Sequence, residues 1–291
     1  MLNSGGIDAL RVVNKGGRPA QLDDAQYETL RQIMLAGPQS AGFDTDLWTL
    51  KRVREVIRCR FGVRFSEVHV RRLLGKLGFS TQKPERQAKD RDEAAIARWK
   101  KRTWPAQKKC RDEGRLIVFI DESGLSERPS RVRTWAPVGQ PPFIQFHFNW
   151  KQLSVIAGLS LTDCLFRLHE GAIRSPQIVQ FLRALRQHLQ QRLLIVWDGL
   201  RAHRSRLVRQ YEASTGGDIE LAYLQPYAPK LNPVEYLSAW LKRNAMANFC
   251  PNGFAELKQR ARAKLKSAQR RQVIVAACWI QADLFHCREP T

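Results

Sequence analysis

Three acidic residues stand where they could act together in metal-dependent chemistry. Asp121 and Asp198 each directly follow an apolar run, at 116–120 and 193–197, and Glu235 lies one turn into a predicted helix. Ionised carboxylates that face one another are stable mainly when a cation lies between them. Oxygen ligands favour Mg²⁺ or Mn²⁺, and two such ions about 4 Å apart could activate a water or a hydroxyl for phosphodiester displacement.

Each of these acids also has an ordinary structural explanation. Asp121 could cap the end of a strand, and its neighbour Glu122 is an alternative ligand. Asp198 could form an Asx turn with Gly199, and Glu235 is a favourable acid in the first turn of a helix. These explanations are preferred for each residue singly, but not for the set once the element order and the charge of the chain are considered.

The strands and helices predicted around these acids indicate a mixed sheet. The predicted strands are residues 116–120, 153–161, 164–169, 193–197 and 219–224. The predicted helices are residues 175–192, with Ser175 as N-cap and Pro176 at its first position, 202–213, and a helix from about 232. This order is that of an α/β ribonuclease H-like fold, a mixed sheet flanked by helices, which we assign to residues 114–291. Asp121 and Asp198 are then expected at strand ends, where the reactive crevice of such sheets lies.

Residues 21–82 predict an all-α domain of the helix-turn-helix, winged-helix-like type. Its predicted helices are residues 24–36, 47–60 and 67–77, capped by Asp23 or Asp24, by Asp46 and by Ser66. The candidate DNA contacts of the last helix are Ser66, His69, Arg71, Arg72 and Lys76. The alternative is any small three-helix domain with a solvated basic face.

Two further segments flank this domain. Residues 1–20 read as a basic flexible arm, in which Arg18, between Gly and Pro, could lie in a DNA minor groove. An ordinary linker is the alternative for that arm. Residues 83–113 are polar with a helical pattern interrupted at Pro105, and we expect them to form a helical connector between the two domains.

The charge of the chain indicates a polyanionic partner. It has 291 residues with 49 Lys and Arg against 27 Asp and Glu, a net charge of +22. Nucleic acid is favoured over a merely solvated basic surface. No apolar run approaches the ~18 residues of a membrane span, and the N-terminus lacks the order of a secretory signal. The six cysteines have no metal-site spacing, so we expect free thiols in a reducing compartment.

Three segments resemble the catalytic blocks of the mariner superfamily of DDE transposases, in particular its bacterial insertion-sequence-six-thirty branch. They are IDESGLSERPSRVRTWAPVGQPP (120–142), VWDGLRAH (196–203) and LQPYAPKLNPVEYLSAWLK (224–242). The last block is the most specific, because its Pro-Tyr-x-Pro-x-Leu-Asn-Pro-x-Glu string has little reason to recur by chance.

The resemblance implies roles for particular residues. Asp121, Asp198 and Glu235 match the metal-binding acidic triad, for which two Mg²⁺ or Mn²⁺ ions are expected. His203 matches a residue found near that site and would have a supporting role, with a purely structural histidine as the alternative. Asn232 would shape the start of the helix that aims Glu235.

The resemblance also implies an activity and its partners. It implies cut-and-paste movement of DNA between terminal inverted repeats, with insertion at TA dinucleotides of double-stranded DNA. A homodimer is expected in the synaptic complex, because two active sites must act on two ends. The protein would work in the bacterial cytoplasm, associated with the nucleoid, and no membrane partner is expected.

One departure from the family pattern affects these expectations. Family members begin with two helix-turn-helix units, yet only about twenty residues precede Arg18. The alternatives are an N-terminally truncated chain, a misassigned start and one piece of a two-frame element, and in each case we expect weakened recognition of the transposon end. The rival functions are a catalytically inert or repurposed sequence-specific DNA-binding protein and a structure-selective nuclease on the same fold. The resemblance favours the transposase.

Overall fold

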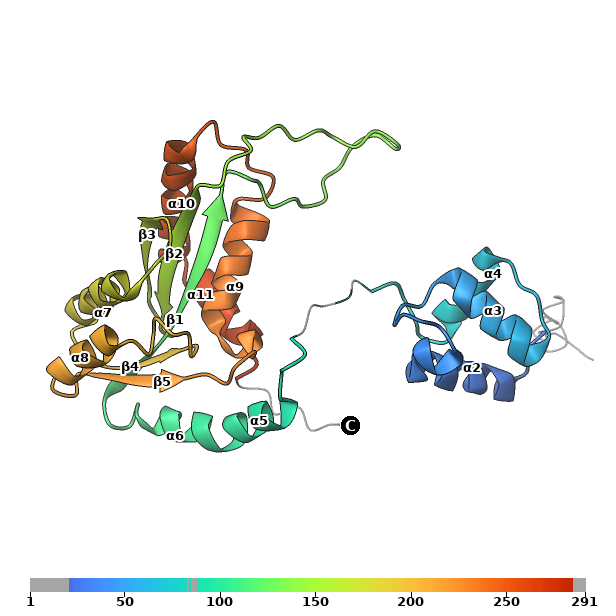
Figure 1. Cartoon of the computed structure of the whole chain (residues 1–291), viewed down its shortest axis with the longest axis horizontal. Helices are drawn as coiled ribbons and strands as arrows, with labels where there is room; N and C mark the ends of the chain where they lie inside the picture. Colours follow the sequence, from blue (N-terminus) through green and yellow to red (C-terminus); the bar gives the residue numbers. More distant parts are fainter. Residues whose placement is uncertain (1–20, 83, 85–87, 285–291) are drawn as a thin grey trace, which may run out of the picture. The chain divides into compact units, whose positions relative to one another are not determined.

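The computed structural model describes residues 21–82, 84 and 88–284, so Arg18 and the arm expected at 1–20 lie outside the described residues (Figure 1). The chain divides into two compact units, residues 1–85 and 86–291. Within the described part, no helix is long and apolar enough to cross a membrane.

The first unit is built from short helices around an apolar core. Its elements are α2 (Asp24–Ala36), the 3₁₀ turn η1 (Gln39–Ala41), α3 (Leu50–Phe61) and α4 (Glu67–Lys76). Its buried residues include Leu30, Val53, Ile57, Val70 and Leu73. The predicted caps Asp23 and Ser66 are confirmed, and Asp23 forms a capping box with Gln26.

The prediction that Asp46 begins the second helix was wrong. α3 begins at Leu50, and its cap is Thr49. The preceding segment is held in another conformation, because the indole N–H of Trp48 donates to the Met34 carbonyl at 3.0 Å and the guanidinium of Arg52 bonds two carbonyls in this turn. These tertiary contacts outweigh the local capping preference of an aspartate.

The second unit contains the predicted mixed sheet. Its strands are β1 (Arg115–Ser126), β2 (Gln152–Leu159), β3 (Cys164–Glu170), β4 (Arg192–Trp197) and β5 (Ile219–Tyr223), in the spatial order β3-β2-β1-β4-β5 (Figure 1). The β1–β2 and β2–β3 pairs are antiparallel, whereas β4 is parallel to β1 and β5 is parallel to β4. The antiparallel start and parallel later strands are those expected from the sequence.

Helices cover both faces of this sheet. They are α7 (Ser175–Leu189), α8 (Arg206–Ser214), α9 (Pro233–Trp240), α10 (Phe254–Gln269) and α11 (Gln272–Gln281). Side chains alternate along β1, so that Ile117 and Phe119 are buried with α9, α10 and α11, whereas Val118 and Ile120 are buried with α7. This alternation decides which face each later residue of β1 occupies.

Two predicted helix starts in this unit were wrong. Arg174 is the N-cap of α7, and Ser175 is already helical with its hydroxyl donating to the Ala202 carbonyl at 3.4 Å. α8 begins at Arg206 rather than at 202, with Ser205 as its cap. For α7 the boundary moved by one residue, whereas for α8 the local cap at Ser205 begins the helix later than predicted.

The segment expected to be an interdomain connector carries helices that belong to the second unit. These are α5 (Glu93–Arg98), the π-helical turn η2 (Trp99–Thr103) and α6 (Trp104–Lys109). Trp99 and Trp104 are each only 3% exposed and lie in the same core as Phe119. Pro105 does not interrupt the helix, because it falls in the first turn of α6. Although the segment is mostly polar, its few apolar residues, such as Trp99 and Trp104, pack it onto the core of the second unit.

Candidate active site

Asp121 lies within β1 and not at its end, so its predicted position was wrong. β1 pairs with the parallel strand β4 only over residues 115–119 and then continues to Ser126 through antiparallel pairing with β2. Asp121 is therefore the second residue beyond the last pair with β4. One partner strand is sufficient to keep β1 extended, whereas the other side of β1 opens at this point.

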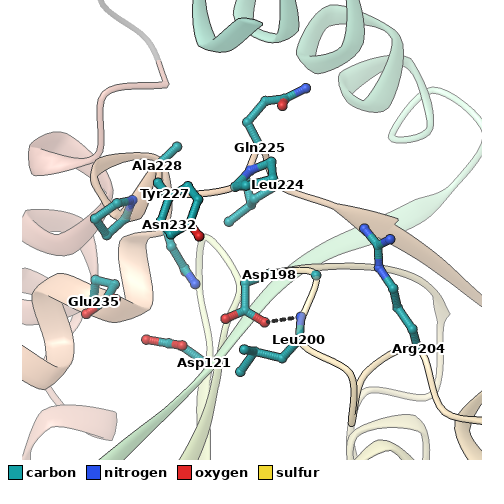
Figure 2. A pocket seen from close by; sticks show the side chains of 13 residues that line it. Asp121, Asp198, Leu200, Arg204, Leu224, Gln225, Tyr227, Ala228, Asn232 and Glu235 are labelled. Carbon is teal, nitrogen blue, oxygen red and sulfur yellow. Dashed lines mark hydrogen bonds between the residues drawn. The ribbon is translucent and has the colours of Figure 1, made fainter. Parts of the chain in front are cut away.

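Asp198 lies beside Asp121 at the same height of the sheet. The parallel ladder pairs Phe119 with Val196, and each aspartate is two residues beyond that pair. Because side chains alternate with a period of two, both aspartates share the face covered by α9. Figure 2 shows both carboxylates pointing into the same pocket. The position predicted for Asp198, directly after β4, is confirmed.

Glu235 reaches this pocket from α9, whose start is tied to β1. Asn232 is the N-cap of α9, and its side-chain oxygen accepts from the Val234 N–H at 3.1 Å. Its amide nitrogen donates to the carbonyl of Ile120, also at 3.1 Å, and the residue is only 3% exposed. One buried side chain thus joins the start of the helix that carries Glu235 to the residue before Asp121.

The three acids line one cavity of about 520 Å³. Its polar lining also includes Arg204, Gln225 and Asn232 (Figure 2). In the described part of the chain, no three His, Cys, Asp or Glu side chains are close enough to form a ready-made coordination shell. The structure therefore brings the predicted triad into one cavity, with its carboxylates apart.

The electrostatics of this cavity favour a cation. Burial, reinforced by the charges of Glu235 and Asp198, raises the pKa of Asp121 to about 8. Burial also raises the pKa of Glu235 above its usual value. The carboxylates of Asp121 and Glu235 form no salt bridge in the described part of the chain, although the charge of Lys242 acts on Glu235, and they offer the oxygen donors that suit Mg²⁺ or Mn²⁺.

Glu122 occupies the opposite face of β1 and does not line the cavity. Its Oε1 lies 3.1 Å from Nε2 of His203, whose Nδ1 lies 2.7 Å from Oδ1 of Asp198. The alternation of the strand thus places Asp121, and not Glu122, in the lining of this cavity. Glu122 instead reaches the site indirectly, through His203.

His203 is enclosed and held in a fixed orientation. It is 1% exposed, and its ring stacks on the indole of Trp197 with centroids 4.3 Å apart and planes 3° from parallel. Although burial opposes the charged form, hydrogen bonds to Asp198 and Glu122 raise the pKa of His203 to about 9. Burial of Asp198 is in turn outweighed by its hydrogen bond with His203, and the pKa of Asp198 is lowered. The two groups therefore form a charge-assisted pair at neutral pH.

Arg204 is a cavity residue that the sequence reasoning missed. Its guanidinium lies over the ring of Tyr223, 4.6 Å from the centroid, and Figure 2 shows its side chain on the far side of Leu200 from Asp198. The sequence could have indicated Arg204 as a site residue only through its position directly after His203. Nearby, the backbone N–H of Leu200 donates to Oδ1 of Asp198 at 3.2 Å. The cavity thus combines anionic groups with one cation at its rim.

The residues predicted to contact DNA in the first unit divide into two kinds. Arg71, Arg72 and Lys76 are exposed on α4. Ser66 and His69 are also exposed, but both make contacts within the unit. The hydroxyl of Ser66 accepts from the His69 N–H at 3.2 Å, and the ring of His69 stacks on Phe65 with centroids 4.3 Å apart.

Comparison with known proteins defines the class of both parts of the chain. Residues 116–258 match the family model described as DDE superfamily endonuclease, and residues 44–103 match the model described as winged helix-turn-helix. The chain therefore contains a DDE superfamily endonuclease domain preceded by a DNA-binding helix-turn-helix. No curated protein sequence matches the chain.

Solved structures show the same architecture. The Mos1 strand transfer complex aligns with a TM-score of 0.65 and 17% identity, covering 92% of this chain and 76% of that chain. The mariner Mos1 paired-end complex with Mg aligns with a TM-score of 0.64 and 18% identity, over 93% of this chain and 82% of that chain. The Mos1 transposase paired-end complex with left transposon end gives 0.61 and 18%, with the same coverage. These likenesses confirm the predicted ribonuclease H-like fold class.

Proposed function

We propose that the protein is a DNA transposase that cleaves phosphodiester bonds at transposon inverted repeats and joins the released ends to target DNA at TA dinucleotides. One observation carries the proposal: Asp121, Asp198 and Glu235, far apart in sequence, line a single cavity. The DDE endonuclease domain, the helix-turn-helix and the fold shared with Mos1 transposase complexes support it. The resemblance of the three sequence blocks supports the bacterial branch of the superfamily.

Asp121, Asp198 and Glu235 are the proposed ligands of two divalent ions. The Mos1 paired-end complexes described with Mg and with Mn support this choice of metal. When bound, such ions would activate a water or a 3′-hydroxyl and steady the leaving oxygen. The protein supplies the oxygen donors from β1, from the residue directly after β4 and from α9, and the Asn232 contact with Ile120 keeps the donor on α9 near the donor on β1.

Three other residues would support the reaction without binding metal. His203 and Glu122 would orient the carboxylate of Asp198, as hydrogen-bonded partners of metal ligands do in other proteins. Arg204 would contact a phosphate of the bound strand, because its guanidinium lines the cavity and bidentate phosphate recognition suits this side chain.

The helix-turn-helix would hold the DNA through α4. Arg71, Arg72 and Lys76 offer exposed cations on this helix, and Ser66 and His69 lie at its start. Arg18 would add a minor-groove contact. A homodimer would place one active site at each of two transposon ends, on double-stranded DNA in the bacterial cytoplasm.

Cleavage by an Asp198→Asn variant tests the proposal. The wild-type chain should nick and join inverted-repeat DNA with Mg²⁺, and the variant should lose at least about 10³-fold in rate, since a metal stabilises the transition state by several kcal/mol. Its salt-sensitive DNA binding should persist. Glu220→Gln, at an exposed acid on β5, is the matched control.

The outcomes separate the rival functions. Binding without any metal-dependent cleavage by the wild-type chain would support the inert or repurposed DNA-binding protein. Cleavage without joining of ends would support the nuclease. Unchanged cleavage by the Asp198→Asn variant would remove this residue from the mechanism.

A further inference from the structure

A second cavity, of about 530 Å³, runs along β3 at one edge of the sheet, and we call it the β3 groove. Residues of α7 and α10 line it together with the strand. Figure 1 shows where these three elements lie in the second unit. Its polar lining residues are Arg167, His169, His188, Arg262, Lys266 and Gln269. Among the described residues, no acidic side chain lines the groove.

The cations of the β3 groove have no acidic partner. Among the described residues, no salt bridge involves Arg167, Arg262 or Lys266, although Lys258 on α10 pairs with Glu170 at 2.9 Å. Residues 258, 262 and 266 follow one another at intervals of four and therefore lie along one side of α10. Unpaired cations that line a concave surface concentrate their field and attract anions.

His169 adds a polar group that lacks a partner. Its Nε2 is shielded from solvent and makes no hydrogen bond within the described part of the chain. Burial, together with the charge of Arg167, lowers the pKa of His169. The neutral ring can present an N–H to an oxygen acceptor. An oxygen acceptor, such as a phosphate oxygen, would satisfy this nitrogen.

The groove lies at the same height of the sheet as the candidate active site. The ladder pairs Asp121 with Ala157 and Ala157 with Phe166, a lining residue of the groove. Two strand spacings of roughly 4.8 Å separate β1 from β3, about 10 Å in all. Along the sheet, the β3 groove therefore lies within about one major-groove width, ~12 Å, of the row that holds Asp121.

We propose that the β3 groove binds the phosphate backbone of double-stranded DNA flanking the bonds that are cut or joined. The inference rests on the proposed function, because it assigns that substrate a second contact surface. Each phosphate neutralised by an Arg or Lys releases condensed counterions, so the contact must appear in the salt dependence of binding. A groove that binds only small anions or acidic proteins would not contribute to the salt dependence of binding to duplex DNA.

The experiment compares the full chain with an Arg262→Ala and Lys266→Ala double variant. Binding to a long inverted-repeat duplex is measured against salt concentration in EDTA, so that cleavage plays no part. Loss of two phosphate contacts should reduce the slope of log K against log salt by about 1.8. A Lys109→Ala and Arg111→Ala variant removes the same charge near the amino end of β1 and should leave the slope unchanged.

The results distinguish this inference from the proposed function. An unchanged slope in the α10 variant, or an equal fall in the control, overturns the inference even when the wild-type chain cleaves DNA. A reduced slope confined to the α10 variant supports the groove even if no cleavage is observed. Arg262 and Lys266 are exposed, so their substitution should not destabilise the fold. Melting temperatures equal to that of the wild-type chain will show that the variants are folded.

Discussion

Asp198 and His203 are joined by a 2.7 Å contact between a carboxylate oxygen and a ring nitrogen, on a histidine that is almost completely enclosed. The other ring nitrogen faces Glu122, which belongs to the opposite face of the sheet. A carboxylate held in this way loses little conformational freedom when it binds a ligand. The histidine thus links the proposed metal site to a residue outside the cavity.

A His203→Phe variant should weaken metal binding by about 10- to 100-fold, the cost seen for loss of hydrogen-bonded partners of metal ligands. Phenylalanine can keep the stacking on Trp197 but cannot hold Asp198 or Glu122. Mn²⁺ titration followed by electron paramagnetic resonance measures the affinity directly.

The conservative variants make this test specific to positioning. Glu122→Gln retains an acceptor for the ring and should stay close to the wild-type affinity, whereas Glu122→Ala should resemble His203→Phe. His147→Phe, at an exposed residue, is the control. Wild-type Mn²⁺ affinity in the folded His203→Phe variant would contradict the positioning role.

Asn232→Ala should lower both stability and cleavage. The variant leaves the carbonyl of Ile120 unsatisfied in a buried place and removes the cap of α9, and each loss costs about 1–3 kcal/mol. Asn232→Ser can still cap the helix but cannot reach β1. We therefore expect urea unfolding to show partial recovery of stability for Asn232→Ser while cleavage stays low. Full recovery of cleavage would show that only the cap matters.

The stability of the metal-free protein should fall as pH rises through the range set by Asp121. The pKa of this carboxyl is 3.8 ordinarily and about 8 in the folded chain, so the folded state binds the proton more tightly. This contribution to stability is present in full below about pH 4 and is lost as the pH rises towards about 8.

Asp121→Asn removes this titration and should melt several degrees higher than the wild-type chain at pH 8, at about 2–4 °C per kcal/mol. The difference should vanish near pH 4. Melting curves in EDTA from pH 4 to 9 measure it, and a difference that does not depend on pH would contradict the assignment.

The first unit should supply phosphate contacts through α4. An Arg71→Ala and Arg72→Ala variant should bind DNA more weakly and flatten the salt slope by about one to two. Arg31→Ala, on α2, is the control, because Arg31 already pairs with Glu28 at 3.5 Å. An unaltered slope in the α4 variant would place the docking face elsewhere.

The sequence by itself was sufficient for the order of the strands, and it indicated three acids that the fold brings to one cavity. The apolar runs at 116–120 and 193–197 predicted two buried strands, and the Asn-Pro start predicted the helix of Glu235. These patterns are local, and the period of the side chains reports burial directly. The helix starts predicted at Asp46 and Ser175 were wrong. Near each of these starts the folded chain makes contacts with residues distant in sequence, which local capping preferences do not include.

Only the tertiary structure places Asp121 and Glu122 on different sides of β1. The two acids are adjacent in sequence, and which of them lines the cavity depends on which face of β1 packs against α9. The same holds for His203, whose partners are a neighbour in sequence and a residue 81 positions away. Strand register and side-chain alternation create these relationships, because both are set by pairing between segments that local propensity treats as independent.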